Sequence, residues 1–164
     1  MTQPRTVLVV WGAWLAATLA AIAAGTAILP QRTETAVGGP LGPIWGWDWN
    51  WYAQIASRGY PASSSPDYAF LPLWPAVIRV SEAVGVGAWG VWLIVVVATG
   101  LLFAGAASAH RRIDPRADGA QTAVALACLP GSSLLVIAYP DALVAAAIAW
   151  SATVAARRPL ASVA

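Results

Sequence analysis

The sequence predicts an all-α protein that crosses a membrane several times. Its 164 residues are 59% hydrophobic and only 10% charged, whereas a soluble domain carries about a quarter charged residues. The apolar residues fall into long runs, and two runs reach the roughly 20 residues that a helix needs to cross a bilayer. A net charge of +2 without a basic patch gives no sign of nucleic-acid binding. We therefore expect about four transmembrane helices in a single membrane domain, residues 1–164, with an outer first loop that carries a short interfacial helix.

The first predicted span covers residues 7–29 and follows Arg5. Its apolar core is longer than the ~7–15 residues of a secretory signal, so an uncleaved anchor is favoured over a signal peptide. Residues 30–84 form the predicted outer loop, which Gly-Pro pairs and a serine run punctuate. Within it, residues 50–57 predict a short helix that ends before Gly59, and its tryptophan and tyrosine suit the headgroup layer.

The second half of the chain predicts the remaining spans. Residues 68–80 are apolar but broken by Pro72 and Pro75, which favours a re-entrant or interfacial segment. Residues 85–109 predict the second span, which arginines follow. The rest of the chain is again apolar, apart from a turn-like interruption.

That last region predicts a helical hairpin with spans 119–138 and 142–156, turning near residues 139–141. A single crossing would place the arginine pairs 111–112 and 157–158 on opposite sides of the membrane. Two crossings place both pairs on the cytoplasmic side, as the positive-inside tendency prefers. The hairpin is therefore favoured.

This topology predicts that both termini are cytoplasmic and that Asp48 and Asp141 lie together on the outer side. All nine basic residues are arginine, and alanine is abundant. Such a bias is typical of a GC-rich bacterial genome. We therefore expect a multi-pass protein of the bacterial plasma membrane.

Three motifs follow one another between residues 47 and 150. The first is WDWNWY (47–52) with GYP (59–61) behind it, the second is YAFLPLWP (68–75) followed by Arg79, and the third is AYPD (138–141). In this order they resemble the N-terminal portion of the PIG-V-like mannosyltransferases, which are membrane glycosyltransferases of the GT-C type. In the third motif, aspartate stands for the family's glutamate and proline for its hydroxyl residue.

The resemblance covers only part of that family's length, because its full-length members have many more spans. Three alternatives stay open: a truncated gene product, a fragment of a longer reading frame, or a reduced relative. A non-catalytic membrane protein, acting as an accessory or structural component with a partner subunit, is the rival interpretation. A small transporter subunit is disfavoured, because the spans lack the paired intramembrane acids of ion coupling.

The resemblance implies transfer of mannose from a polyprenyl-phosphate-mannose donor to a hydroxyl of a glycolipid, glycan or protein on the outer membrane face. The donor is a lipid-linked sugar, and no cofactor is implied. Asp48 matches the family's presumed general base. Asp48 and Asp67 flank one loop, but two isolated acids without further ligands predict no metal site.

Asp48 stands among four tryptophans in a chain where acids are scarce. Aromatic walls would partly desolvate this carboxylate and raise its pKa, which suits a base that accepts a hydroxyl proton. Asp48 or Asn50 is alternatively a cap of the helix that follows, or Asp48 is merely exposed at the surface. The tryptophans alternatively form an interfacial belt.

The other candidate residues would bind the substrate. Aromatic rings stack on sugar faces, and arginine binds phosphate oxygens in a bidentate manner. Arg79 lies in an apolar segment, where an ionisable group is costly and usually functional; its alternative is snorkelling to the interface. Arg58 is alternatively a solvated helix end, and Asp141 either orients Arg79 or the acceptor or is a turn residue. The candidate substrate-binding residues are Trp47, Trp51, Tyr52, Arg58, Tyr60, Arg79 and Asp141.

Overall fold

The computed structural model describes residues 4–29, 37–61 and 69–156, and every regular element within these ranges is helical. The all-α fold class is therefore confirmed. The predictions for Asp67 and for the arginine pair 157–158 lie outside the described residues. In chain order the elements are α1 (Pro4–Ile28), η1 (Gly42–Trp45), α2 (Trp49–Arg58), α3 (Leu73–Ala83), α4 (Gly87–Ile113), α5 (Gly119–Ala127), η3 (Ser132–Val136) and α6 (Asp141–Ala155).

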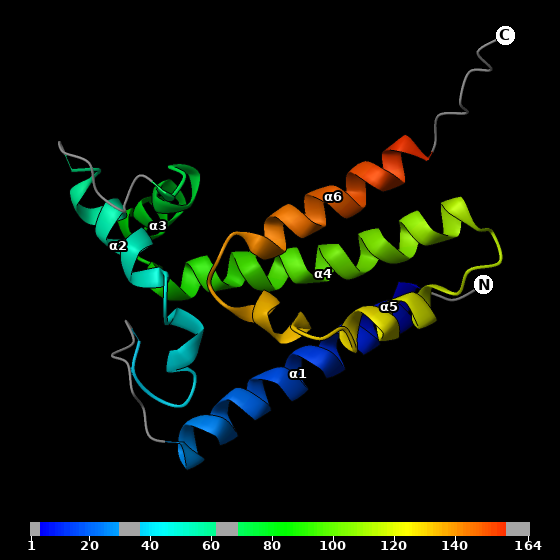
Figure 1. The fold of residues 1–164 in the computed structure, drawn as a ribbon, viewed down its shortest axis with the longest axis horizontal. Helices are drawn as coiled ribbons and strands as arrows, with labels where there is room; N and C mark the ends of the chain where they lie inside the picture. The colour runs from blue at the N-terminus through cyan, green and yellow to red at the C-terminus, as the bar shows by residue number, and fades with distance from the viewer. Residues whose placement is uncertain (1–3, 30–36, 62–68, 157–164) are drawn as a thin grey trace, which may run out of the picture.

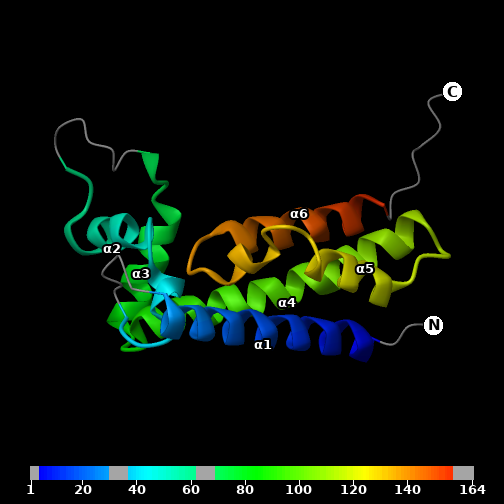
Figure 2. The same ribbon diagram turned by 60° about the horizontal axis from the view of Figure 1, so that its bottom comes forward.

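Helix α4 is the central element, and α1, α5 and α6 pack along it (Figure 1). Helices α1 and α5 run opposite to α4, whereas α6 runs in the same direction (Figures 1 and 2). The start of α1, the connection from α4 to α5 and the end of α6 therefore lie at one end of the molecule. Helices α2 and α3 lie at the opposite end, which we call the α2–α3 end.

Among the helices of the described ranges, two are long and apolar enough to cross a membrane. They are α1 with 25 residues and α4 with 27 residues, and they correspond to the predicted spans 7–29 and 85–109. Their length and composition support a membrane location. A hydrogen bond joins α1 to α4: Trp11 Nε1 donates to Thr99 Oγ1 at 3.0 Å. The fully buried Thr99 hydroxyl therefore has a hydrogen-bond donor as partner.

The predicted span 119–138 is not one continuous helix. Helix α5 ends at Ala127 after 9 residues, and Gly131 follows with a left-handed φ of 80° before the short η3. Pro130 lacks the N–H that would continue the helix, and Gly131 adopts the left-handed conformation without a steric penalty. Helix α6 has 15 residues, or about 22 Å, which is shorter than the ~30 Å hydrocarbon core. The four-span arrangement is therefore not confirmed by helix length.

The two short helices of the predicted outer loop agree better with expectation. The helix predicted over 50–57 is confirmed as α2, which ends at Arg58 and is followed by Gly59 with a left-handed φ of 78°. The segment expected to be interfacial forms α3, whose 11 residues extend about 17 Å. Like α2, it is too short to cross a bilayer.

Helices α4 and α6 approach closely at Gly105. A Cβ atom added there would lie 3.1 Å from the Ala149 Cβ and from ring atoms of Trp150. Thr153 Oγ1 donates to the Gly105 carbonyl oxygen at 3.1 Å, and Trp150 Nε1 donates to the Leu101 carbonyl oxygen at 3.0 Å. The absence of a side chain at Gly105 therefore permits the packing of the two helices.

Replacing Gly105 by valine is expected to lower the free energy of unfolding by about 1–3 kcal/mol, because the added atoms overpack the α4–α6 contact. Denaturant titration in detergent micelles measures this change. Gly12→Val is the matched control, because an added Cβ at Gly12 meets nothing within 4 Å, and it should change stability by less than about 0.5 kcal/mol. Equal stability of the two variants would contradict the close approach.

Candidate functional site

The three motifs singled out in the sequence are joined by hydrogen bonds at the α2–α3 end. The Ala138 backbone N–H donates to the Ile44 carbonyl oxygen at 3.0 Å. The indole of Trp74 donates to the Ala138 carbonyl oxygen at 3.0 Å, and the indole of Trp92 donates to the Val136 carbonyl oxygen at 3.1 Å. The η1 segment before the first motif, the first turn of α3, the second turn of α4 and the segment before α6 are thus fixed to one another.

The four tryptophans around Asp48 divide into two pairs. Trp45 and Trp49 are 0% and 3% exposed, whereas Trp47 and Trp51 are 64% and 38% exposed. The Trp45 indole donates to the Ala88 carbonyl oxygen at 3.2 Å. Only Trp47 and Trp51 are therefore available to a ligand or a membrane interface, and the other two belong to the hydrophobic core.

Aromatic side chains continue outward from Trp51. Its ring stacks on Phe70 with centroids 6.1 Å apart and planes 15° apart. Tyr52 meets Phe70 edge-on at 5.0 Å and Tyr139 edge-on at 6.1 Å. Rings from the first loop, from the segment before α3 and from the segment before α6 therefore form one aromatic row.

Asp48 occupies the N-cap position of α2, but its side chain makes no capping hydrogen bond. Its backbone is α-helical, with φ −68° and ψ −11°, whereas a capping side chain normally needs an extended backbone. The alternative that the Asp48 carboxylate caps the helix is therefore wrong, and Asn50 already lies inside α2. The Asp48 backbone N–H donates instead to the hydroxyl of Tyr139.

The Asp48 side chain is exposed, so the described residues do not enclose it in the aromatic niche that we expected. The reason lies in the preceding residue. Trp47 has a left-handed φ of 51°, a conformation that costs a non-glycine residue about 1–2 kcal/mol. This turn lies between the buried Trp45 and Trp49, and the two residues that it contains, Trp47 and Asp48, are exposed.

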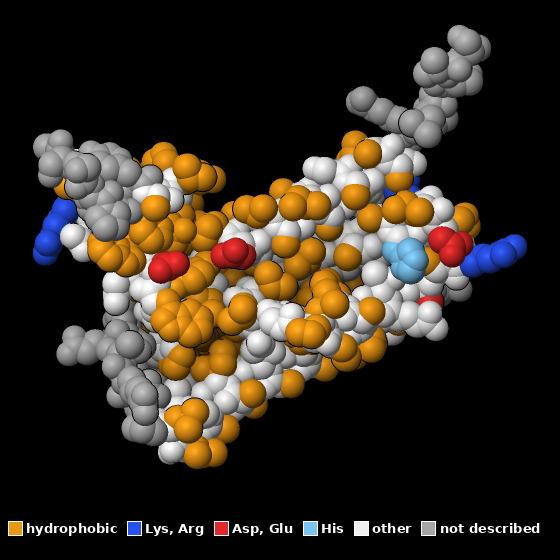
Figure 3. Space-filling model, in the orientation of Figure 1, with side chains coloured by type: hydrophobic (Ala, Val, Ile, Leu, Met, Phe, Trp, Pro, Cys, Tyr) orange, Lys and Arg blue, Asp and Glu red, His pale blue; other side chains and the backbone are white. Residues whose placement is uncertain are grey.

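Asp48 and Asp141 lie close to the same tyrosine. Burial raises the pKa of Tyr52, and the negative charges of Asp141 and Asp48 raise it further. Asp141 begins α6 and Asp48 precedes α2. Figure 3 shows two acidic side chains near each other, among apolar side chains, over the region between α2 and the start of α6.

Tyr139 is the functional candidate that sequence reasoning missed. Its hydroxyl donates to the Gly46 carbonyl oxygen at 3.0 Å and accepts the Asp48 N–H. Burial raises the pKa of Tyr139, while the hydrogen bond from the Asp48 backbone opposes that rise. The signal available in the sequence was its place in the AYPD motif, directly before Pro140 and Asp141.

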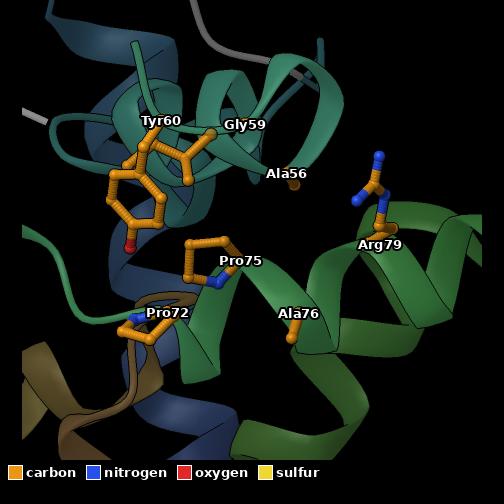
Figure 4. Close-up of a pocket in the computed structure, with 8 residues that line it drawn as sticks. Ala56, Gly59, Tyr60, Pro72, Pro75, Ala76 and Arg79 are labelled. Atoms are coloured by element: carbon orange, nitrogen blue, oxygen red, sulfur yellow. The ribbon is translucent and has the colours of Figure 1, made fainter. Parts of the chain in front are cut away.

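Arg79 and Tyr60 line a separate pocket of about 200 Å³ between α2 and α3. Figure 4 shows the two side chains at opposite ends of this pocket, with Pro75 and Ala76 between them. The Tyr60 hydroxyl donates to the Phe70 carbonyl oxygen at 2.5 Å. Asp48 does not line the pocket.

The structure does not bring Arg58 to Asp48. The two residues lie at opposite ends of α2, about 15 Å apart along the axis at 1.5 Å per residue. Arg79 is exposed, which also fits its alternative interpretation as a snorkelling side chain. The candidate site consists of the four residues that lie close to one another, Asp48, Asp141, Tyr52 and Tyr139.

Within the described residues, no group of three or more histidine, cysteine, aspartate or glutamate side chains is placed to hold a metal ion. Comparisons of the chain with protein-family models, with curated proteins and with solved structures found no match.

Proposed function

We propose that the chain is a membrane glycosyltransferase that uses a polyprenyl-phosphate sugar, as its resemblance to the PIG-V-like mannosyltransferases of the GT-C type implies. The observation that carries the proposal is that Asp48 and Asp141 both lie near enough to Tyr52 for their charges to act on its hydroxyl, in a region where Figure 3 shows two acidic side chains near each other. These acids come from the first and the third motif, 93 residues apart in the chain. A carboxylate that is not used as a helix cap is available to accept a proton.

The direction of the helices supports an outer position for this site. The N-terminal part of α1 and the basic residues His110, Arg111 and Arg112 in the last turn of α4 lie at the end opposite to α2 and α3. Cytoplasmic ends of membrane helices carry an excess of arginine and lysine. We therefore propose four passes across the bacterial plasma membrane, both termini in the cytoplasm, and the acids outside.

The proposed reaction is a displacement at the sugar. The acceptor oxygen forms a bond to C1 of mannose while the bond from C1 to the phosphate oxygen breaks, and the phosphate leaves with the electron pair. Asp48 takes up the proton of the acceptor hydroxyl. The donor phosphate remains at the headgroup layer, so a catalytic group at the membrane surface suits this chemistry.

The remaining candidates differ in their support for a substrate-binding role. Trp47 and Trp51 are exposed and suit stacking on a sugar face. Arg79 is the favoured ligand of the donor phosphate, because its pocket is otherwise lined mainly by apolar groups that suit an isoprenoid chain. Arg58 lies ~15 Å from Asp48 along α2, and the Arg79 pocket is lined by Ala56 and Gly59 near that same end of the helix. The separation from Asp48 therefore weighs on both arginines, and the apolar lining is what favours Arg79.

The test of the proposed function is transfer of radiolabelled mannose from a polyprenyl-phosphate-mannose donor in membranes. Membranes that contain the chain should form labelled glycolipid, glycan or glycoprotein, and matched membranes without the chain should not. Equal labelling of both would contradict the enzymatic proposal. It would favour a non-catalytic membrane protein that acts with a partner subunit.

A further inference from the structure

The hydroxyl of Tyr139 contacts both sides of the strained residue beside Asp48. It donates to the carbonyl oxygen of Gly46, at 3.0 Å, and accepts the N–H of Asp48. Trp47 lies between these two backbone groups and has the left-handed φ of 51°. One side-chain oxygen therefore connects the residues before and after the turn.

Packing of the Trp47 side chain does not explain why the turn persists, because this side chain is 64% exposed. An unfavourable backbone conformation is retained only where surrounding contacts fix it. Further backbone hydrogen bonds in this segment run from Trp49 N–H to the Gly46 carbonyl and from Asn50 N–H to the Trp47 carbonyl, at 3.2 Å and 3.4 Å. Among the hydrogen bonds that the structure describes for residues 46–48, those to the Tyr139 hydroxyl reach a distant part of the chain.

The position of Tyr139 is itself well determined. The residue before it, Ala138, is fully buried and is held by Ile44 through its N–H and by Trp74 through its carbonyl oxygen. The Tyr139 ring also meets Tyr52 edge-on. Because burial raises the pKa of Tyr139 above its usual value near 10, the hydroxyl keeps its proton at neutral pH and remains a hydrogen-bond donor.

We propose that Tyr139 is a positioning residue: its hydroxyl holds the turn of residues 46–48 and thereby directs the Asp48 carboxylate toward the side where Asp141 lies. The catalytic consequence rests on the proposed function. The stabilisation of the turn does not depend on the proposed function, because it follows from the two hydrogen bonds of the Tyr139 hydroxyl. A carboxylate base whose orientation is already fixed in the free enzyme reorganises less when the transition state forms.

Tyr139→Phe tests the hold on the turn without an activity assay. The variant keeps the aromatic ring and removes only the oxygen, so the contact with Tyr52 and the buried segment at Ala138 should remain. Hydrogen–deuterium exchange of the Asp48 amide should become about 2- to 10-fold faster, the range that corresponds to the net contribution of one hydrogen bond. Tyr52→Phe is the matched control and should leave this exchange rate unchanged. Equal Asp48 exchange in wild type and Tyr139→Phe would overturn the proposal.

The catalytic consequence is tested with the mannosyl-transfer assay. Tyr139→Phe should lower kcat about 10-fold or more while the KM for the donor changes less than 2-fold. In an Asp48→Asn background, Tyr139→Phe should cause no further loss, because there is no base left to direct. A 10-fold loss in both backgrounds would indicate general structural damage and overturn the positioning role.

The two readouts separate this proposal from the proposed function. Faster Asp48 exchange in Tyr139→Phe, combined with no transfer by the wild type, would support the hold on the turn and remove the enzymatic function together with the catalytic consequence. Unchanged exchange combined with active wild type would overturn the role of Tyr139 and leave the enzymatic proposal in place.

Discussion

Replacing Asp48 by asparagine is expected to lower mannosyl transfer by about 10²–10⁴-fold, the usual contribution of a general base. Asparagine has nearly the same size but does not accept a proton from the acceptor hydroxyl. The fold should persist, because the Asp48 side chain is exposed and makes no capping hydrogen bond to α2. Initial rates at saturating donor measure the effect.

Asp114→Asn is the matched control for this experiment. Asp114 is exposed and caps the C-terminal end of α4, far from α2. Its carboxylate accepts the Arg116 backbone N–H at 2.9 Å, and the amide oxygen of asparagine accepts the same bond. This variant should keep the wild-type rate. Equal rates for wild type and Asp48→Asn would remove Asp48 from the mechanism.

Replacing Trp45 by alanine is expected to lower the free energy of unfolding by about 3–5 kcal/mol, as is typical when a buried aromatic side chain is truncated. Trp45 is fully buried, meets the Trp89 ring edge-on at 4.6 Å and donates a hydrogen bond to Ala88. The variant loses the buried side chain, the ring contact with Trp89 and the hydrogen bond to Ala88, where the first loop packs against α4. Denaturant titration in detergent micelles measures the loss.

Trp47→Ala provides the comparison for Trp45→Ala. It is the same chemical change two residues away, but the Trp47 side chain is 64% exposed. Its effect on the free energy of unfolding should be less than about 1 kcal/mol. A loss for Trp47→Ala as large as that for Trp45→Ala would show that the division of the tryptophans into core and surface pairs is wrong.

The elements that depend on local pattern could be predicted from the sequence. Long apolar runs predicted α1 and α4, and the stretch up to Gly59 predicted α2, because hydrophobicity and turn residues act over a few positions. The break after α5 was also visible as Pro130-Gly131. It was missed because the apolar character of the region continues through it.

The assembly of the candidate site could be predicted only in part. The motif resemblance identified Asp48 and Asp141, but the contact of Tyr139 with Gly46 and Asp48 joins residues more than 90 positions apart. The hydrophobic periodicity of the sequence does not predict a contact between residues so far apart in the chain. The sequence also did not predict which of the four tryptophans are buried, and the left-handed backbone between them at Trp47 is a conformation that sequence patterns do not predict for a bulky residue.

The central claim is that Asp48 and Asp141 lie together on the non-cytoplasmic side of the membrane. Side-specific cysteine labelling tests it most directly, with Asp48→Cys, Asp141→Cys and Asp114→Cys introduced singly in a Cys128→Ala background. A membrane-impermeant maleimide should label the first two in intact cells and the third only in inverted membrane vesicles. Labelling of Asp48→Cys and Asp141→Cys from opposite sides, or of both from the cytoplasm, would contradict the claim.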